Sequence, residues 1–296
     1  MTEEQKPIGS RERTREILAA YGLTFKKSLG QNFLTEPTIL RQIASAAELT
    51  TADDVLEIGP GIGSLTEQLA QNAHQVLALE IDQRLLPILA DTLAPYDNVT
   101  VLNQDVLKSD LATLIRDHFD GQHKVKVVAN LPYYITTPIL LRLLESGVTF
   151  DQIVVMMQKE VAERLAADPG SKAYGSLSVA VQYQMTVKLA FIVPKTVFVP
   201  QPNVDSAIVS LTRHVTPPAV ATDEKVFARL VRGSFAQRRK SLWNNLTALY
   251  GKDSATKAAL TEVLAAEKID PGIRGERLSV TDFVRLANAI SAHAKL

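Results

Sequence analysis

The stretch Val55-Leu-Glu-Ile-Gly-Pro-Gly-Ile-Gly63 decides the fold of this 296-residue chain. A short apolar run leads into three glycines at alternate positions, and a helix-like segment begins directly after them. This pattern is typical of nucleotide-binding α/β folds, because glycine lets the backbone approach a ligand and a helix N-terminus offers unpaired N–H groups. A glycine trio alone is as often a merely tight turn, so the flanking segments must support the interpretation.

The flanking segments alternate between strand and helix patterns. Seven runs rich in β-branched residues are predicted strands, at 55–58, 75–80, 99–103, 125–129, 153–157, 187–193 and 207–211. The predicted helices between them are 64–71, 83–93, 110–119 and 137–145, and an earlier helix starts near Pro37. This alternation predicts a Rossmann-like α/β fold with a mostly parallel sheet and helices on both faces.

The last third of the chain has a different pattern. Residues 214–223 include two prolines, break the periodicity and are predicted to form a linker. Helical patterns alone follow, at 225–237, 239–250, 254–266 and 280–292. We therefore predict a basic N-terminal segment (1–35), an α/β domain (36–215) and a small helical domain (216–296).

Composition excludes several classes of protein. The chain is 46% hydrophobic and 22% charged and has no Cys, which excludes disulfides, a thiol nucleophile and thiolate metal ligands. Its five histidines form no pair at helical spacing, so neither a metal site nor Ser-His-Asp chemistry is predicted. No signal-peptide core and no uncharged apolar stretch of 18 residues occurs, which favours a soluble cytoplasmic protein, and nothing demands more than a monomer.

The formal net charge of zero conceals an uneven distribution. Residues 49–120 hold twelve acidic and three basic residues, so this block carries −9 and the remainder +9. An acidic region around the glycine turn repels a dinucleotide phosphate and suits a cationic cofactor. A basic remainder suits a nucleic-acid partner.

Acidic residues follow the next two predicted strands. Glu80 ends the second strand, where it could accept hydrogen bonds from both ribose hydroxyls of an adenosine. NAD enzymes share such an acid, but their fingerprint requires a glycine where Ser64 stands. Asp105 follows the third strand, within reach of an adenine amino group. With Gly59 and Gly61, these acids resemble the binding site of class I methyltransferases for S-adenosyl-L-methionine.

The fourth strand ends in Asn130-Leu-Pro-Tyr133, which resembles the tetrapeptide of methyltransferases acting on exocyclic amines. The version with Leu is similar to that of the rRNA adenine-N6 dimethyltransferase family. Residues 27–34, 198–206 and 235–243 match further motifs of that family in the right order. The resemblance covers nearly the whole chain and implies a class I methyltransferase fold, with a seven-stranded sheet and a small C-terminal all-α domain.

The chemistry of an adenine amine explains the tetrapeptide. The N6 lone pair is delocalised into the ring, so acceptors aimed at its hydrogens are needed to make the nitrogen nucleophilic. The Asn130 side-chain oxygen and the Leu131 carbonyl are the predicted acceptors, Pro132 fixes the turn, and Asn130 also borders the cofactor. A sulfonium leaving group needs no charged base, so positioning would supply most of the catalysis. The alternative interpretation of Asn130 is a structural role as a helix-capping residue.

The target base must leave its stack, and aromatic faces can offset that cost. The resemblance implies that Tyr133 and Phe198 lie on either side of the base, whereas Tyr134 is expected to pack behind them. An ordinary core position is the alternative for Phe198. The resemblance further implies that Asn32 and Leu34 close over the cofactor.

Residues 225–246 contain six basic residues and no acid. Such a run is usually a solvated helix face. Here it follows the segment that holds the predicted base-modifying residues, which favours a role in binding RNA phosphates. Arg238, Arg239 and Lys240, near Trp243, are the predicted RNA contacts.

These features predict an enzyme that dimethylates two adjacent adenines near the 3′ end of small-subunit rRNA, within an assembling subunit. One alternative is the large-subunit methyltransferase of macrolide resistance, which the long basic C-terminal domain and Leu131 disfavour. Another is a non-catalytic RNA-binding assembly factor, which the intact tetrapeptide disfavours. A third alternative is an NAD-dependent oxidoreductase, which is disfavoured because the chain offers no plausible acid for hydride transfer.

Overall fold

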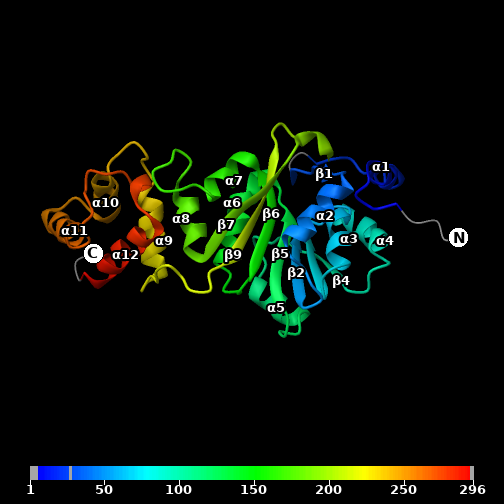
Figure 1. The fold of residues 1–296 in the computed structure, drawn as a ribbon, viewed down its shortest axis with the longest axis horizontal. Coiled ribbons are helices and arrows are strands. Elements are labelled where there is room, and N and C mark those ends of the chain that lie inside the picture. Colours follow the sequence, from blue (N-terminus) through cyan, green and yellow to red (C-terminus); the bar gives the residue numbers. More distant parts are fainter. Residues whose placement is uncertain (1–5, 27–28, 294–296) are drawn as a thin grey trace. The chain divides into compact units, whose positions relative to one another are not determined.

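The computed structural model describes residues 6–26 and 29–293, which form two compact units (Figure 1). The first unit comprises the residues up to 162 together with Val187–Arg213, and the second comprises Glu163–Thr186 and the residues from His214 onward. The division differs from the predicted one, which assigned residues 163–186 to the α/β domain. They group with the second unit because α8 (Ser176–Gln184) packs against α9 (Glu224–Ser234) and α12 (Val280–Ala292).

The first unit is built on a seven-stranded sheet in the order β4-β3-β2-β5-β6-β9-β7. The five strands from β4 to β6 are parallel, and β9 runs antiparallel to β6. This arrangement confirms the predicted α/β class. The strands are β2 (Asp53–Ile58), β3 (Gln75–Glu80), β4 (Val99–Asn103), β5 (Lys124–Asn130), β6 (Gln152–Gln158), β7 (Met185–Val193) and β9 (Ser206–Arg213).

Helices cover both faces of this sheet (Figure 1), because its central strands β2, β3, β5 and β6 are largely buried on both sides. On one face Val55 and Val128 pack with Ile43 of α2 and Leu69 of α3. On the other face alternate residues such as Leu56 are equally buried. The helices are α1 (Arg11–Ala20), α2 (Pro37–Ala46), α3 (Ser64–Ala70), α4 (Leu86–Thr92), α5 (Leu111–His118), α6 (Thr136–Leu144) and α7 (Lys159–Leu165).

The winding direction reverses between β2 and β5. From β2 the chain proceeds to β3 on one side, whereas β5 and β6 lie on the other side. In open parallel sheets, ligands bind outside the carboxyl ends of the strands at such a reversal. A second sheet of two short strands, β1 (Phe33–Leu34) and β8 (Phe198–Val199), pairs the N-terminal segment with the segment that precedes β9.

The second unit is helical. Helices α8, α9, α10 (Leu242–Tyr250), α11 (Ser254–Ala266) and α12 enclose a core that includes Leu230, Leu246 and the fully buried Phe283. The predicted helix 225–237 ends at Ser234, and α10 begins only after its N-cap Ser241. Among the described residues, no helix has the length and apolar character needed to cross a membrane.

Candidate active site

The glycine turn lies where the sequence predicted it, between β2 and α3. Gly61 has a φ of +64°, which glycine adopts without strain, and a Cβ there would lie 3.0 Å from the Phe33 ring. A side chain at this position would be strained by the positive φ and crowded against the Phe33 ring. The turn brings its backbone to one wall of a pocket at the carboxyl ends of β2 and β5.

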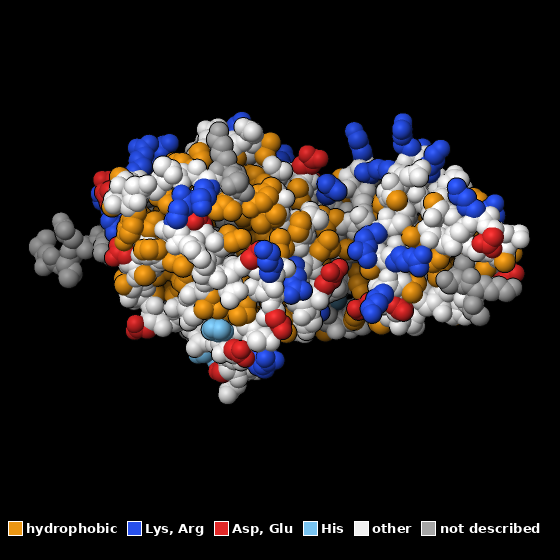
Figure 2. Space-filling view, turned by 180° about the vertical axis from the view of Figure 1, so that it is seen from behind, with side chains coloured by type: hydrophobic (Ala, Val, Ile, Leu, Met, Phe, Trp, Pro, Cys, Tyr) orange, Lys and Arg blue, Asp and Glu red, His pale blue; other side chains and the backbone are white. Residues whose placement is uncertain are grey.

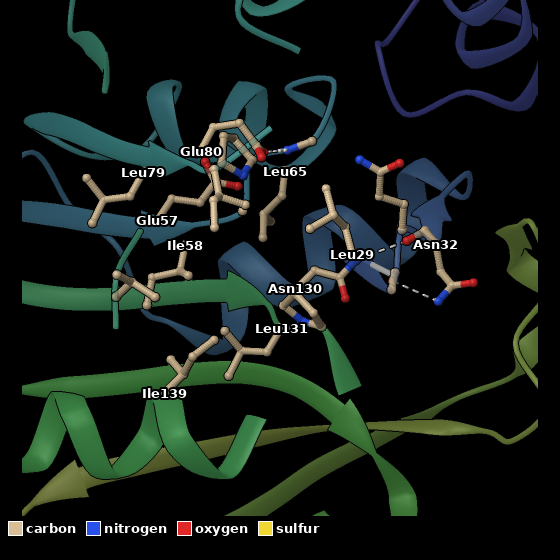
Figure 3. Close-up of a pocket in the computed structure, with 18 of the residues that line it drawn as sticks. Leu29, Asn32, Glu57, Ile58, Leu65, Leu79, Glu80, Asn130, Leu131 and Ile139 are labelled. Carbon is tan, nitrogen blue, oxygen red and sulfur yellow. Dashed lines mark hydrogen bonds between the residues drawn. The ribbon is translucent and has the colours of Figure 1, made fainter. Parts of the chain in front are cut away.

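This pocket has an empty volume of about 1140 Å³ with its open mouth included. Glu57 and Glu80 lie on one side and Asn130 and Asn32 on the other, as Figure 3 shows. Gly59, Gly61 and Asp105 also line it, so the structure brings the predicted cofactor contacts together. Among the described lining residues there is no Lys or Arg, which makes the cavity acidic.

Glu80 is held in place at the tip of β3. Its Oε1 accepts a hydrogen bond from the Asp82 N–H at 2.7 Å, and its Oε2 accepts one from the Gly61 N–H at 3.3 Å. Each carboxylate oxygen can accept a further bond from a ligand hydroxyl. Burial raises the pKa of Glu80, against the effect of these two backbone donors.

Glu57 is the acid that the sequence analysis did not assign a role. It is 1% exposed, and its Oε2 has no hydrogen-bond partner among the described residues. Burial raises the pKa of this carboxyl to about 8. An unpartnered buried carboxyl in a ligand pocket favours a cationic ligand. Its position within the glycine motif, two residues before Gly59, was the available signal.

The N-terminal segment forms the roof of the pocket. Asn32 and Leu34 line it as expected, whereas Lys27 and Ser28 of the same motif lie outside the described residues. Asp82 anchors this segment by accepting a hydrogen bond from Gln31 Nε2 at 2.9 Å. The neighbouring Arg84 guanidinium, with a shortest contact of 2.6 Å, holds the pKa of Asp82 well below its usual range.

The tetrapeptide Asn130–Tyr133 begins at the last residue of β5 and borders the pocket. The Asn130 side chain donates from Nδ2 to the Asn32 carbonyl at 3.4 Å, so its Oδ1 is the amide atom left to accept from a ligand. Pro132 starts the next turn, and its own carbonyl accepts from the Thr136 hydroxyl at 3.0 Å. Leu131 is buried and donates its N–H to the Met156 carbonyl.

The aromatic residues differ from expectation at two positions. Tyr133 lines the pocket, and its hydroxyl is hydrogen-bonded to Ser206 of β9. Phe198 is 2% exposed and packs in the core with Leu34, which lies opposite it in the pairing of β8 with β1, and it is not among the residues that line the pocket. Tyr134, which was expected to pack behind the site, is instead 56% exposed and lines the pocket.

The basic residues of the second unit separate into two kinds. Arg238 donates to Glu276 Oε2 at 3.1 Å and to the carbonyls of Lys172 and Tyr174, so its guanidinium ties together parts of its own unit. Arg239 and Lys240 are exposed in the turn between α9 and α10. Lys and Arg side chains are spread widely over this unit (Figure 2).

Comparison with known proteins agrees with this geometry. A sequence model described as ribosomal RNA adenine dimethylase matches residues 22–290. The chain belongs to this family. The curated protein named ribosomal RNA small subunit methyltransferase A from Ligilactobacillus salivarius is 63% identical over 290 residues, which cover 98% of both chains. The protein of the same name from Enterococcus faecalis is 61% identical over 97% of both chains.

Solved structures show the fold of this dimethylase family. A dimethyladenosine transferase from Plasmodium falciparum superposes with a TM-score of 0.69 at 28% identity, over 85% of this chain and 94% of that one. The 23S rRNA methyltransferase ErmE superposes with a TM-score of 0.65 at 26% identity, over 87% of this chain and 99% of that one. The methyltransferase family and the class I fold imply S-adenosyl-L-methionine, and the acidic pocket with its unpartnered Glu57 oxygen fits that cation.

Proposed function

We propose that the chain dimethylates the N6 amines of two adjacent adenosines near the 3′ end of small-subunit rRNA. The observation that carries this proposal is the position of Asn130-Leu-Pro-Tyr133, which faces the acidic wall of Glu57 and Glu80 across one pocket. The names and high identity of the small-subunit relatives favour this substrate over large-subunit rRNA. We infer that this RNA is methylated within an assembling small ribosomal subunit, in the cytoplasm.

The acidic wall would hold S-adenosyl-L-methionine, which supplies an electrophilic methyl group on a sulfonium. Glu80 accepts from the ribose hydroxyls with the lone pairs that Gly61 and Asp82 leave unused. Asp105 lies on the pocket wall, where its carboxylate would accept from the adenine amine. Glu57 offers a buried counter-charge to the positive end of the molecule. Asn32 and Leu34 cover the cofactor from the roof.

Asn130 and Leu131 would activate the target amine. Because the Asn130 amide nitrogen donates to the Asn32 carbonyl, its oxygen is directed to accept an N6 hydrogen. The Leu131 carbonyl accepts the other hydrogen, since the next carbonyl, that of Pro132, is bonded within the turn. The nitrogen would become more tetrahedral and attack the sulfonium methyl group in line. The S–CH3 bond would break, the sulfur would leave as a neutral thioether, and the proton of the methylated amine would go to solvent. Positioning supplies most of the rate.

Tyr133 would stack on the flipped adenine, with its ring fixed through the bond to Ser206. Tyr134 offers a second, open aromatic face at the pocket. Base–aromatic stacking contributes about 1–3 kcal/mol per base, which is comparable to the cost of unstacking. The exposed Arg239 and Lys240 would contact RNA phosphates.

The decisive experiment measures methyl transfer from labelled cofactor to unmethylated small subunits and, in parallel, to naked large-subunit rRNA. We expect label in two adjacent adenosines near the 3′ end of the small-subunit RNA. Label found in the large-subunit RNA alone would assign the chain to the macrolide-resistance type. Absence of label in both RNAs, with cofactor still bound, would favour a non-catalytic assembly factor.

A further inference from the structure

Two histidines that are 49 positions apart in the sequence lie against each other in the first unit. His74 directly precedes β3 and His123 directly precedes β5. Their rings stack with centroids 3.8 Å apart and 14° between the ring planes. No metal site was predicted here because the histidines form no pair at helical spacing, and the sequence does not record that β3 and β5 flank β2.

The strand register adds a carboxylate to this pair. Asp54 of β2 is aligned with Gln75 on one side and with Val125 on the other, so both histidines lie at the same edge of the sheet as Asp54. One donor atom from each of Asp54, His74 and His123 lies within 4.8 Å of the other two. Histidine side chains are visible beside acidic ones at the lower edge of the first unit in Figure 2.

Asp54 is an unusual partner for two histidines because it is fully buried. Its Oδ1 contacts His74 Nδ1 at 2.9 Å, while its Oδ2 is buried without a hydrogen-bond partner among the described residues. A buried carboxylate oxygen in this condition costs free energy unless a donor or a cation satisfies it. The orphaned oxygen points to a ligand of the cluster.

We propose that Asp54, His74 and His123 form a binding site for a divalent transition-metal ion, with zinc as the best match. Two imidazole nitrogens and one carboxylate are ligands that zinc prefers, and water would complete four-coordination. At zinc–ligand distances of about 2.0–2.1 Å, two ligands of a tetrahedral ion lie about 3.3 Å apart. The 2.9 Å between Asp54 and His74 is close to this value.

To bind the same ion, His123 has to move. Its ring must turn out of the stack with His74 so that one ring nitrogen faces the ion. Its side chain is 22% exposed and lies in a loop, so the movement displaces no core residue. Asp120 Oδ1 contacts its Nδ1 at 3.0 Å, which leaves Nε2 to bind the ion. A carboxylate behind a histidine ligand is the usual support in zinc sites.

The site would join the beginnings of β2, β3 and β5, at the edge of the sheet opposite the candidate active site. Its role is therefore structural, and a bound ion would stabilise the folded state by mass action. The site is independent of the methyl-transfer proposal, since none of its residues lines the pocket.

The test uses the full chain without a histidine tag, stripped of metal and titrated with zinc against a chromogenic chelator. We expect one zinc ion per chain and a rise in melting temperature. His74→Ala and His123→Ala should each weaken zinc binding at least tenfold and abolish the rise, and Asp120→Asn should weaken it about 10- to 100-fold. Retained methyl transfer in these variants would show that they fold.

His118→Ala is the matched control, because His118 ends α5 close by but contacts the Leu114 carbonyl instead of the cluster. It should bind zinc as the parent chain does. Equal zinc affinity in the parent, His74→Ala and His123→Ala would overturn the proposal. A parent chain that shows no saturable zinc binding would also overturn it. So would a loss of zinc binding in His118→Ala equal to the loss in His74→Ala and His123→Ala.

Discussion

Asn130 illustrates how one residue depends on a distant segment of the chain. Its amide is oriented by the backbone carbonyl of Asn32, which lies 98 positions earlier and belongs to the roof of the pocket. The roof is itself anchored to Asp82 through Gln31. The acceptor oxygen is therefore oriented only when the N-terminal segment is in place.

Replacement of Asn130 should separate catalysis from cofactor binding. Asn130→Ala removes one aimed acceptor and should lower turnover by about 100-fold or more, the scale observed when one preorganised polar group is lost. Asn130→Asp keeps an acceptor oxygen but loses the donor to the Asn32 carbonyl, so its turnover should fall between those of the parent and the Ala variant. Single-turnover methyl transfer and cofactor affinity measure the two effects. Full turnover in Asn130→Ala would refute this account of amine activation.

Glu80 should affect cofactor binding itself. Charge-assisted hydrogen bonds contribute about 1.5–3 kcal/mol, so Glu80→Ala should raise the Kd of the cofactor by roughly 10- to 150-fold. Isothermal titration calorimetry measures this change, and circular dichroism checks that β3 is intact. An unchanged Kd would remove Glu80 from the ribose site.

Glu57 predicts a pH dependence of cofactor binding. Burial raises its pKa to about 8, so the free pocket holds this carboxyl largely protonated at neutral pH. A cationic ligand favours the ionised form, and binding therefore releases a proton below pH 8. The affinity should rise as the pH increases toward about 8 and then level off.

The control for this prediction is Glu57→Gln, which keeps the shape of the side chain but cannot titrate. It should lose this part of the pH dependence and retain the part that comes from the amine of the ligand. Calorimetry in buffers of different ionisation enthalpy counts the released protons. The same proton release in both proteins would contradict the role of Glu57.

At the scale of elements, alternation in the sequence predicted all seven strands of the large sheet and the glycine turn. Each predicted polar residue of the pocket lies at or just after the end of a strand, and the carboxyl ends of parallel strands share one edge. Glu80, Asp105 and Asn130 could therefore be grouped from sequence alone. Helix α8 was missed because it is buried on several sides, as Leu177, Ser178 and Val179 show, and so lacks amphipathic periodicity.

Contacts between distant segments could not be predicted in this way. The burial of Phe198 depends on its pairing with Leu34, and the engagement of Arg238 depends on Glu276 and residues before α8. No local pattern records these pairings. The same holds for the stack of His74 on His123, which requires the strand order of the sheet.

The turn between α9 and α10 yields a prediction at this scale. Arg239→Gln with Lys240→Gln should weaken RNA binding and reduce its log–log salt slope by roughly 1.5, since each lost phosphate contact contributes about 0.7–0.9. Arg238→Gln should instead lower the melting temperature and leave the slope nearly unchanged, because its guanidinium is used within the unit. Filter binding across a salt series distinguishes the two. Equal changes of the salt slope in the two proteins would contradict this distinction between Arg238 and the pair Arg239 and Lys240.

At the scale of the whole molecule, the acidic block of residues 49–120 does not simply surround the cofactor pocket. Glu57, Glu80 and Asp105 line it. Other members have local partners, such as Lys126 for Asp53 and the N-terminus of α5 for Asp110. The charge asymmetry predicted a cationic ligand, and three carboxyl groups in the pocket rather than twelve acidic residues support that prediction.

The grouping of residues 163–186 with the helical unit can be tested by truncation. A chain that ends at residue 215 keeps α8 but lacks α9 and α12, which exposes Val179 and Tyr183. We expect it to bind the dye ANS and to aggregate. The same truncation with Val179→Thr and Tyr183→Ser should bind less dye. A monomeric truncation without dye binding would contradict the division into units.

The anchoring of the roof by Gln31 on Asp82 also has a kinetic consequence. Two methyl groups on each of two adenosines require four successive cofactor molecules. Displacing residues 29–34 for an exchange would break the Gln31–Asp82 hydrogen bond of 2.9 Å, the contact of Asn130 with the Asn32 carbonyl and the pairing of β1 with β8. The proposed RNA contacts are other residues, Arg239 and Lys240 in the turn between α9 and α10. We therefore expect spent cofactor and RNA to have separate residence times, which would allow all four transfers in a single encounter.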